Sequence, residues 1–150
     1  MIATPNFDQV DPRECVYGKI RRLDRIVNGV YMKEINAFGL RGSMLSLLFL
    51  VGKMGKINQK EIGEKLVLDA STVSRDIKKL MKKGWVTVEA GEDARERVVS
   101  LRKEGYKLLE EVSPVWSAVH AKVVAALGEF SVQQIDQVTS VLANHFKDSD

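Results

Sequence analysis

The chain has 150 residues, of which 45% are hydrophobic and 29% are charged, and its formal net charge is +3. This length and composition suit one globular domain and exclude a chain that is disordered throughout. No apolar run approaches the ~18 residues of a membrane span, and the N-terminus lacks the basic and apolar regions of a signal peptide. Cys15 is the single cysteine. An intrachain disulfide is therefore excluded, and a cytoplasmic location is expected.

Two helices are predicted in the first third of the chain. Asp11–Glu14 has the acidic, proline and glutamate pattern of a helix start, so the first helix is placed within residues 11–37. Its apolar side chains recur at helical spacing, at Val16, Ile20, Leu23, Val27 and Val30. Leu40–Val51 is apolar nearly all round, which predicts a central buried helix. Gly52 and Gly55 are expected to end it.

Residues 56–101 contain two short helices followed by two strands. Asn58 and Asp69 are predicted helix caps, because short polar side chains accept hydrogen bonds from free backbone N–H groups. The helices are expected over Asn58–Leu66 and Asp69–Gly84, and the strands over Trp85–Glu89 and Val98–Leu101. This order is that of a winged helix-turn-helix.

The second helix of this pair has two chemically different faces. Its predicted inner face is apolar and consists of Val73, Ile77, Leu80 and Met81. Its outer face carries small polar and basic side chains, at Ser71, Arg75, Lys78, Lys79 and Lys82. An apolar inner face with a basic outer face is the arrangement expected of a helix that packs on a domain and binds DNA.

The C-terminal part is predicted to be two further amphipathic helices within residues 103–146. Pro114 should kink the first of them, and Gly128 should end it. A capping pattern at Ser131 then starts the last helix. Three amphipathic helices cannot all bury their apolar faces on a module of about fifty residues. We therefore expect residues 11–37 and 103–146 to pack against a second copy of the chain.

The segments STVSRDIKKLMKKGWV and DARERVVSLRKEG resemble the MarR family of bacterial transcriptional regulators, and the resemblance extends over roughly residues 14–146. The characteristic wing positions are Asp93, Arg95, Arg97, Leu101 and Gly105. Two positions depart from the family pattern. Val88 stands where members often carry Arg, and Arg102 stands where they usually carry Thr. The resemblance implies a mainly α-helical fold with a small β-hairpin, in which a winged helix-turn-helix DNA-binding module is joined to a terminal-helix dimerisation region. It also implies a cytoplasmic homodimer that binds double-stranded DNA at a palindromic operator and acts as a repressor.

The predicted DNA-binding residues fall into groups with different roles. Side chains near the start of a recognition helix reach base edges in the major groove, and here they are Ser71, Thr72, Ser74 and Arg75. Lys78, Lys79 and Lys82 lie further along the helix and are expected to contact phosphates. Asn58, Gln59 and Lys60 lie at a helix start, where free backbone N–H groups favour a phosphate.

The wing supplies the remaining contacts. Arg95 is expected to enter the minor groove, where narrow A·T-rich stretches attract a positive charge. Asp93 repels DNA by its own charge, so its expected role is to hold Arg95 in place. Arg97 is the second basic residue of the wing.

The resemblance further implies a small aromatic or phenolic ligand that changes the affinity for DNA. Its expected pocket lies between the first two helices and the winged part. Candidate lining residues are Tyr31, Met32, Phe38, Met44 and Leu48. The alternative is that these side chains belong to the hydrophobic core.

Two other functions remain open at this stage. The first is a redox-sensing transcriptional regulator, because Cys15 lies in the first helix, where one branch of the family has a redox-sensing cysteine. The second is a winged-helix module that binds protein. No cofactor, metal site or catalytic arrangement is predicted, so we do not expect an enzyme. The two histidines, His120 and His145, are not part of any cluster with metal-ligand spacing.

Overall fold

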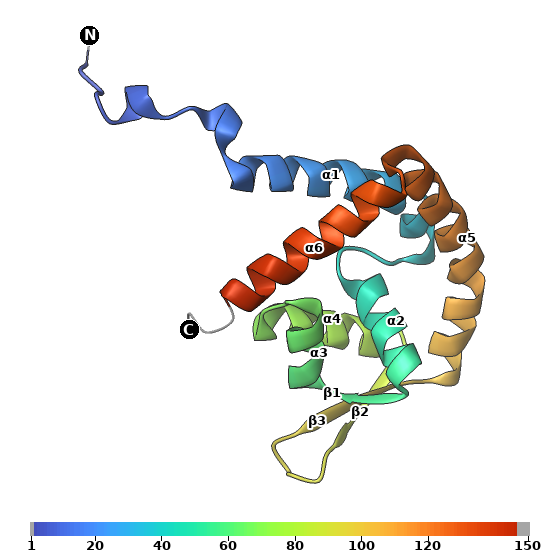
Figure 1. Cartoon of the computed structure of the whole chain (residues 1–150). Coiled ribbons are helices and arrows are strands. Elements are labelled where there is room, and N and C mark those ends of the chain that lie inside the picture. The colour runs from blue at the N-terminus through green and yellow to red at the C-terminus, as the bar shows by residue number, and fades with distance from the viewer. Residues whose placement is uncertain (1, 147–150) are drawn as a thin grey trace.

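The computed structural model describes residues 2–146 and confirms the predicted mainly α-helical fold with a wing (Figure 1). The elements are α1 (Val16–Ile35), α2 (Met44–Met54), β1 (Lys56–Asn58), α3 (Gln59–Leu66), α4 (Ala70–Lys82), β2 (Val86–Ala90), β3 (Arg97–Leu101), α5 (Lys103–Leu127) and α6 (Glu129–His145). Among residues 2–146, no helix has both the length and the apolar character that crossing a membrane requires.

The wing belongs to a three-stranded antiparallel sheet in the order β1-β3-β2. Strand β3 is central: Ser100 pairs with Lys56 of β1, and Leu101 pairs with Val86 of β2. Strand β1 comes directly before α3 in the sequence. The sheet therefore joins the start of the helix-turn-helix to the base of the wing.

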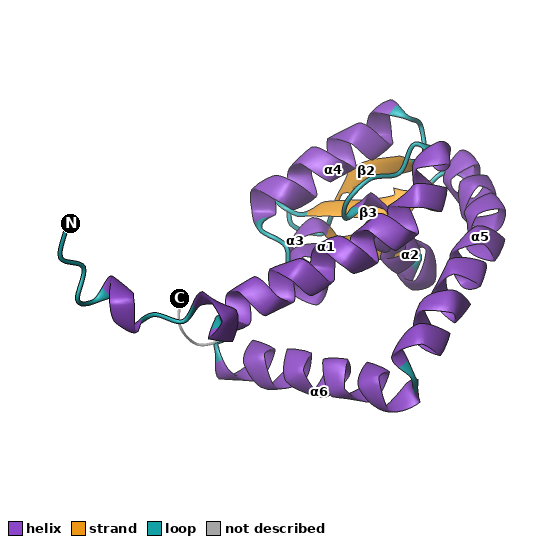
Figure 2. Ribbon diagram, turned by 90° about the horizontal axis from the view of Figure 1, so that it is seen from above, coloured by secondary structure: helices purple, strands orange, loops and turns teal. Residues whose placement is uncertain are grey.

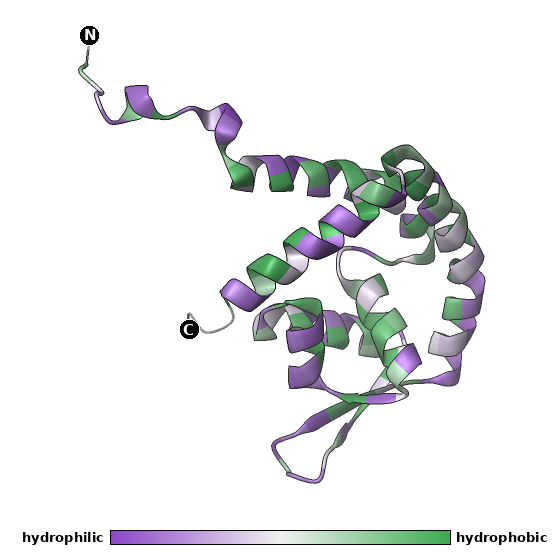
Figure 3. Cartoon of the chain, viewed as in Figure 1, coloured by the Kyte–Doolittle hydropathy of each residue, from purple (hydrophilic) through white to green (hydrophobic). Residues whose placement is uncertain are grey.

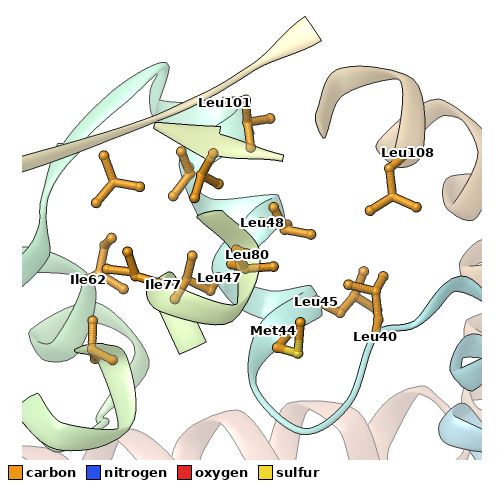
Figure 4. Packing of buried hydrophobic residues seen from close by; sticks show 14 of the residues in the cluster. Leu40, Met44, Leu45, Leu47, Leu48, Ile62, Ile77, Leu80, Leu101 and Leu108 are labelled. Atoms are coloured by element: carbon orange, nitrogen blue, oxygen red, sulfur yellow. The ribbon is translucent and has the colours of Figure 1, made fainter. Parts of the chain in front are cut away.

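Helix α2 is the centre of the hydrophobic core. Leu47, Leu48 and Val51 are each 0% exposed, and they meet apolar side chains from α4, β3 and α5 (Figure 4). The prediction of a central buried helix is thus confirmed, although the helix begins at Met44 rather than at Leu40. It also continues through Gly52, where a Cβ atom would lie 2.9 Å from Leu109 Cδ1. The glycine allows α5 to approach and does not end the helix.

The predicted starts of the first and last helices were both wrong by a few residues. Residues Pro12–Glu14 form a separate 3-10 turn, and α1 begins at Val16 with Cys15 as its N-cap. Asp11 accepts a hydrogen bond from the backbone N–H of Arg13, so it caps that turn instead of the long helix. Helix α6 begins directly after Gly128, whose φ of 79° reverses the chain in one residue. The capping pattern at Ser131 is therefore not used.

Helix α5 remains helical through Pro114 and follows a curved path along the winged part (Figure 1). Pro114 is exposed, so the backbone acceptor that lacks its usual N–H partner lies near the surface. At its start, α5 approaches the wing very closely. A Cβ atom at Gly105 would lie 2.2 Å from the carbonyl oxygen of Trp85, so this position requires glycine.

Helices α1 and α6 both contact α5, and Figure 2 shows α1 crossing over the winged part while α6 runs to one side of it. Helix α6 has no buried residue among its 17, and α1 has only Ile35 among its 20. Both nevertheless carry apolar bands along their length (Figure 3). Their packing is incomplete in a single copy of the chain.

Candidate nucleic-acid interface

A tight turn joins α3 to α4. The side chain of Asn58 accepts a hydrogen bond from the backbone N–H of Lys60 at 2.8 Å, so Asn58 caps α3 as predicted. Helix α3 ends at Leu66, and its C-cap Val67 is 80% exposed and has a left-handed φ of 53°. A β-branched residue is unfavourable in this region because its Cβ crowds the backbone. The turn that positions α4 therefore contains local backbone strain.

Asp69 caps α4 and also binds two hydroxyl groups. Its carboxylate accepts hydrogen bonds from the Ser71 hydroxyl at 2.5 Å, the Thr72 hydroxyl at 2.6 Å and the Thr72 backbone N–H at 2.8 Å. The Ser71 hydroxyl, followed by the hydroxyl and backbone N–H of Thr72, holds the pKa of Asp69 well below its usual range. In this geometry the two hydroxyl groups offer lone pairs, and not hydrogens, to a neighbouring molecule.

The inner face of α4 differs from the prediction at one position. Val73, Ile77 and Leu80 are buried as expected, but Met81 is 41% exposed. The buried position between Val73 and Ile77 on the same face is occupied by Asp76, which is 6% exposed. Because helical residues three and four apart share a face, the position of Asp76 in this stripe was visible in the sequence and was missed.

The outer face of α4 is basic. Arg75, Lys78, Lys79 and Lys82 are all exposed. The ammonium nitrogen of Lys79 lies 3.7 Å from Oδ1 of Asp76, so its charge is partly compensated within the helix. Of the three lysines predicted to contact phosphate, Lys79 is therefore in a different electrostatic environment from Lys78 and Lys82.

The tip of the wing is ordered by backbone hydrogen bonds. The N–H of Gly91 donates to the carbonyl of Glu96 at 3.0 Å, and the N–H of Glu96 donates to the carbonyl of Asp93 at 2.9 Å. The carboxylate of Asp93 accepts a hydrogen bond from the backbone N–H of Arg95 at 2.9 Å. Asp93 thus fixes the main chain at Arg95. Arg97 pairs with Ala90 at the last position of the β2–β3 ladder.

The departures from the family pattern have structural consequences. Val88 is half-buried and packs against the hydrophobic core. Arg102 occupies the N-cap of α5 without a side-chain hydrogen bond to the helix. Neither residue adds to the basic surface of α4.

The predicted groups at the start of α3 and in the wing border one opening, and the predicted DNA-binding residues of α4 lie outside it. Asn58, Gln59 and Lys60 lie there together with Asp69, Arg95 and Arg97. The opening has a volume of about 1540 Å³, and apolar side chains of α1 and α6 form its other side. The fold therefore brings the start of the helix-turn-helix and the arginines of the wing together, although these segments are far apart in the sequence.

The five candidate ligand-binding residues do not line this opening. Met44 and Leu48 are 3% and 0% exposed within the core, and Met32 and Phe38 pack against that core. Tyr31 differs from them, because its hydroxyl forms a 3.0 Å hydrogen bond with Nδ1 of His120. Burial raises the pKa of Tyr31.

His120 belongs to an aromatic group that the sequence did not reveal. Its ring stacks on Trp116 with a centroid distance of 4.7 Å and an interplanar angle of 8°. Trp116 in turn meets Phe49 edge to face at 5.5 Å. This group joins α1, α2 and α5 at their crossing.

Cys15 is exposed, and its sulfur accepts a hydrogen bond from the backbone N–H of Gly18 at 3.4 Å. The redox alternative therefore remains a prediction. Within residues 2–146, no three His, Cys, Asp or Glu side chains are grouped so that they could hold a metal ion.

A capped helix-turn-helix, an exposed basic helix face and a wing with two arginines define a winged helix-turn-helix protein of the kind that binds duplex DNA. Residues 43–96 match the model of the MarR family. Over 95 residues, the chain is 38% identical to the uncharacterized HTH-type transcriptional regulator YwoH of Bacillus subtilis. The matched segment covers 63% of this chain and 69% of YwoH.

Two solved structures show the same fold. The transcriptional regulator MosR of M. tuberculosis, crystallised in complex with DNA, has a TM-score of 0.78 and 24% identity, with 90% of this chain and 99% of that chain covered. The organohalide-sensing regulator RdhR, in its 2,4-dichlorophenol-bound form, has a TM-score of 0.77 and 12% identity, with 95% of this chain and 86% of that chain covered.

The chain belongs to the MarR family and is a DNA-binding transcriptional regulator. MarR-family regulators are DNA-binding proteins rather than enzymes, so the prediction that this chain is not an enzyme is confirmed.

Proposed function

We propose that the protein is a cytoplasmic, homodimeric repressor that binds a palindromic operator through one winged helix-turn-helix from each copy. The observation that carries this proposal is the exposed basic outer face of α4, which lies opposite a buried apolar inner face on the same helix. A recognition helix of this kind fits the major groove, and its two copies read half-sites about one helical turn apart.

The proposed contacts follow from the positions of the side chains. Ser71, Thr72, Ser74 and Arg75 lie in the first turns of α4 and read base edges, and Arg75 is suited to guanine. Lys78, Lys79 and Lys82 contact phosphates along the same helix. Asn58, Gln59 and Lys60 receive a phosphate at the start of α3, and Arg95, with Arg97 behind it, enters the minor groove.

Selection of bound fragments from random duplex DNA tests the proposal directly. A palindrome with half-sites about one helical turn apart is the expected product. The Arg75→Ala variant should lose about 1–3 kcal/mol of discrimination at one base pair of each half-site. Unchanged operator binding by Arg95→Ala would remove the wing from the proposed interface.

Homodimerisation is proposed because α1 and α6 leave their apolar side chains in solvent. The exposed fractions include 45% for Ile20, 57% for Ile26, 54% for Val138 and 41% for Leu142. Several of these side chains border the 1540 Å³ opening described above. An apolar surface of this extent is unusual on a monomer, and a second copy offers the same pair of helices for a two-fold contact.

Charged substitutions test the dimer. Val138→Glu should shift the protein from dimer to monomer in sedimentation equilibrium and should weaken operator binding. Met54→Glu is the matched control, because Met54 is 48% exposed at the far end of α2 and does not border the opening. A dimer that persists unchanged in Val138→Glu would contradict the proposed contact.

We further propose that a small aromatic or phenolic ligand lowers the affinity for DNA. The support is the fold shared with a regulator crystallised with bound 2,4-dichlorophenol, together with the Tyr31–His120 hydrogen bond beside stacked aromatic rings. The melting temperature should rise with phenol concentration, because a ligand that binds the folded state stabilises it. A flat melting temperature across a panel that includes 2,4-dichlorophenol would contradict this part of the proposal.

A further inference from the structure

Asp76 is an unexpected residue for the inner face of α4. It is 6% exposed, and the buried core of residues 2–146 contains no other charged side chain. Burial of a carboxylate is unfavourable unless it is paired and hydrogen-bonded, and an apolar residue of similar size often gives equal or greater stability. The stability of the core therefore does not explain why this position is acidic.

The two oxygens of Asp76 have partners in opposite directions. The hydroxyl of Ser43, 33 positions earlier in the chain, donates a hydrogen bond to Oδ2. Lys79 on the exposed face of α4 approaches Oδ1 at 3.7 Å, and its side chain is 54% exposed. The carboxylate thus links the body of the domain to the face that is proposed to meet DNA.

Ser43 occupies the N-cap of α2, where a serine hydroxyl usually accepts a hydrogen bond from the helix backbone. Here it makes no such bond, and the hydroxyl is directed across to α4. The connection before it contains left-handed glycines at Gly39 and Gly42 on either side of Leu40, which is 0% exposed. The loop is therefore anchored in the core and presents Ser43 to the recognition helix.

We propose that Ser43 and Asp76 form a positioning pair that fixes the rotation of α4 about its axis. Apolar packing is non-directional, so Val73, Ile77 and Leu80 alone leave small rotations of the helix weakly opposed. A hydrogen bond has a preferred direction and opposes them. Arg75 directly precedes Asp76, so this rotation also sets where Arg75 points. The inference rests on the proposed DNA-binding function and concerns how specificity is achieved.

The same pair has a consequence for Lys79. A lysine that is already paired with a carboxylate releases less counterion from DNA than an unpaired one. The salt dependence of binding should therefore change less in Lys79→Ala than in Lys78→Ala. In Asp76→Asn the amide oxygen still accepts from Ser43, but the charge that compensates Lys79 is gone. The salt slope of this variant should become steeper.

The test compares affinity for the selected operator with affinity for random duplex DNA of the same length, in the full-length protein. Ser43→Ala should lower the ratio of specific to non-specific affinity about tenfold, since a hydrogen bond to a charged group contributes on this scale. Ser43→Thr keeps the hydroxyl and should restore the ratio. Ser46→Ala, at an exposed position on α2, is the matched control and should leave the ratio unchanged.

A control for stability separates positioning from simple destabilisation. Val99 is 0% exposed in β3, so Val99→Ala lowers the melting temperature without touching the pair. An unchanged ratio in Ser43→Ala, or an equal fall in Val99→Ala at a temperature where both are folded, would overturn the inference. Equal affinity of the wild type for operator and random DNA would instead overturn the proposed function.

Discussion

Helices α4 and α6 are both amphipathic, but they bury their apolar faces differently. Val73, Ile77 and Leu80 of α4 are each no more than 2% exposed. Helix α6 is longer, at 17 residues against 13 in α4, but none of its residues is buried. The winged part therefore buries its apolar faces within one chain, whereas the apolar face of α6 would be buried only by the proposed second copy.

This contrast predicts two kinds of response to mutation. Changes in the winged part should alter the free energy of unfolding at any protein concentration. Changes on α1 or α6 should act mainly through the concentration at which copies associate, because the stability of a dimer depends on mass action.

The largest expected effect is that of Leu48→Ala, compared with the same change at Leu142. Leu48 is 0% exposed and Leu142 is 41% exposed. Leu48→Ala should lower the free energy of unfolding by about 2–5 kcal/mol, because it leaves a cavity in the core. Leu142→Ala should instead steepen the dependence of the urea midpoint on protein concentration. Equal, concentration-independent losses in both variants would remove the distinction between the two regions.

Gly105→Ala should have the next largest effect. The new methyl group would lie 2.2 Å from the Trp85 carbonyl oxygen, so backbone must move where α5 meets the wing. We expect a loss of about 1–3 kcal/mol in urea unfolding, as for other overpacked sites. Glu104→Ala changes an exposed position in the same turn and should have little effect. A Gly105→Ala variant as stable as Glu104→Ala would show that this contact is not tight.

Arg102→Thr should stabilise the winged part. Arg102 stands at the N-cap of α5 with extended backbone, φ −84° and ψ 169°, but its side chain does not cap the helix. A threonine hydroxyl accepts a backbone N–H at such a position, which contributes about 1 kcal/mol. Arg102→Ala removes the same charge without adding a cap. Identical melting temperatures for the two variants would contradict the expected cap.

The smallest expected effect is the loss of the Asp69 cap in acid. The folded-state pKa of Asp69 is lowered, first by the Ser71 hydroxyl and then by Thr72, so the group stabilises the fold at pH values above its unfolded pKa of about 3.9. That contribution should be lost as the pH falls below about 4. Asp69→Asn should therefore flatten the acid limb of the stability profile. Because Asp69 is exposed, solvent screening keeps the effect small, and an acid limb identical to that of the wild type would contradict it.

Much of the winged part was predictable because its signals are local. Asn58 and Asp69 cap α3 and α4 as expected, since each accepts a backbone N–H two or three residues later. The β-branched and aromatic residues likewise predicted both strands of the wing. Capping also failed where a competing local structure was available, as at Asp11, whose carboxylate binds Arg13.

The candidate site was only partly predictable. The basic side chains of α4 and the place of Asp76 on its inner face follow from helical spacing, but the partner of Asp76, Ser43, lies 33 residues away and does not. The Tyr31–His120 pair spans 89 residues. Of the five residues considered for a ligand pocket, Met44 and Leu48 lie in the core, and an apolar pattern alone does not distinguish a pocket wall from a packed interior.

The sequence by itself determined the order of the elements, the caps of the helix-turn-helix and the separation of apolar and basic faces, because these depend on residues within a few positions of each other. Only the tertiary structure decided that Gly52 lies inside a helix, that Gly105 touches Trp85, that Ser43 serves α4 instead of α2, and that α6 buries nothing. Each of these depends on the close approach of segments that are distant in the chain, and that approach is set by the packing of the whole domain.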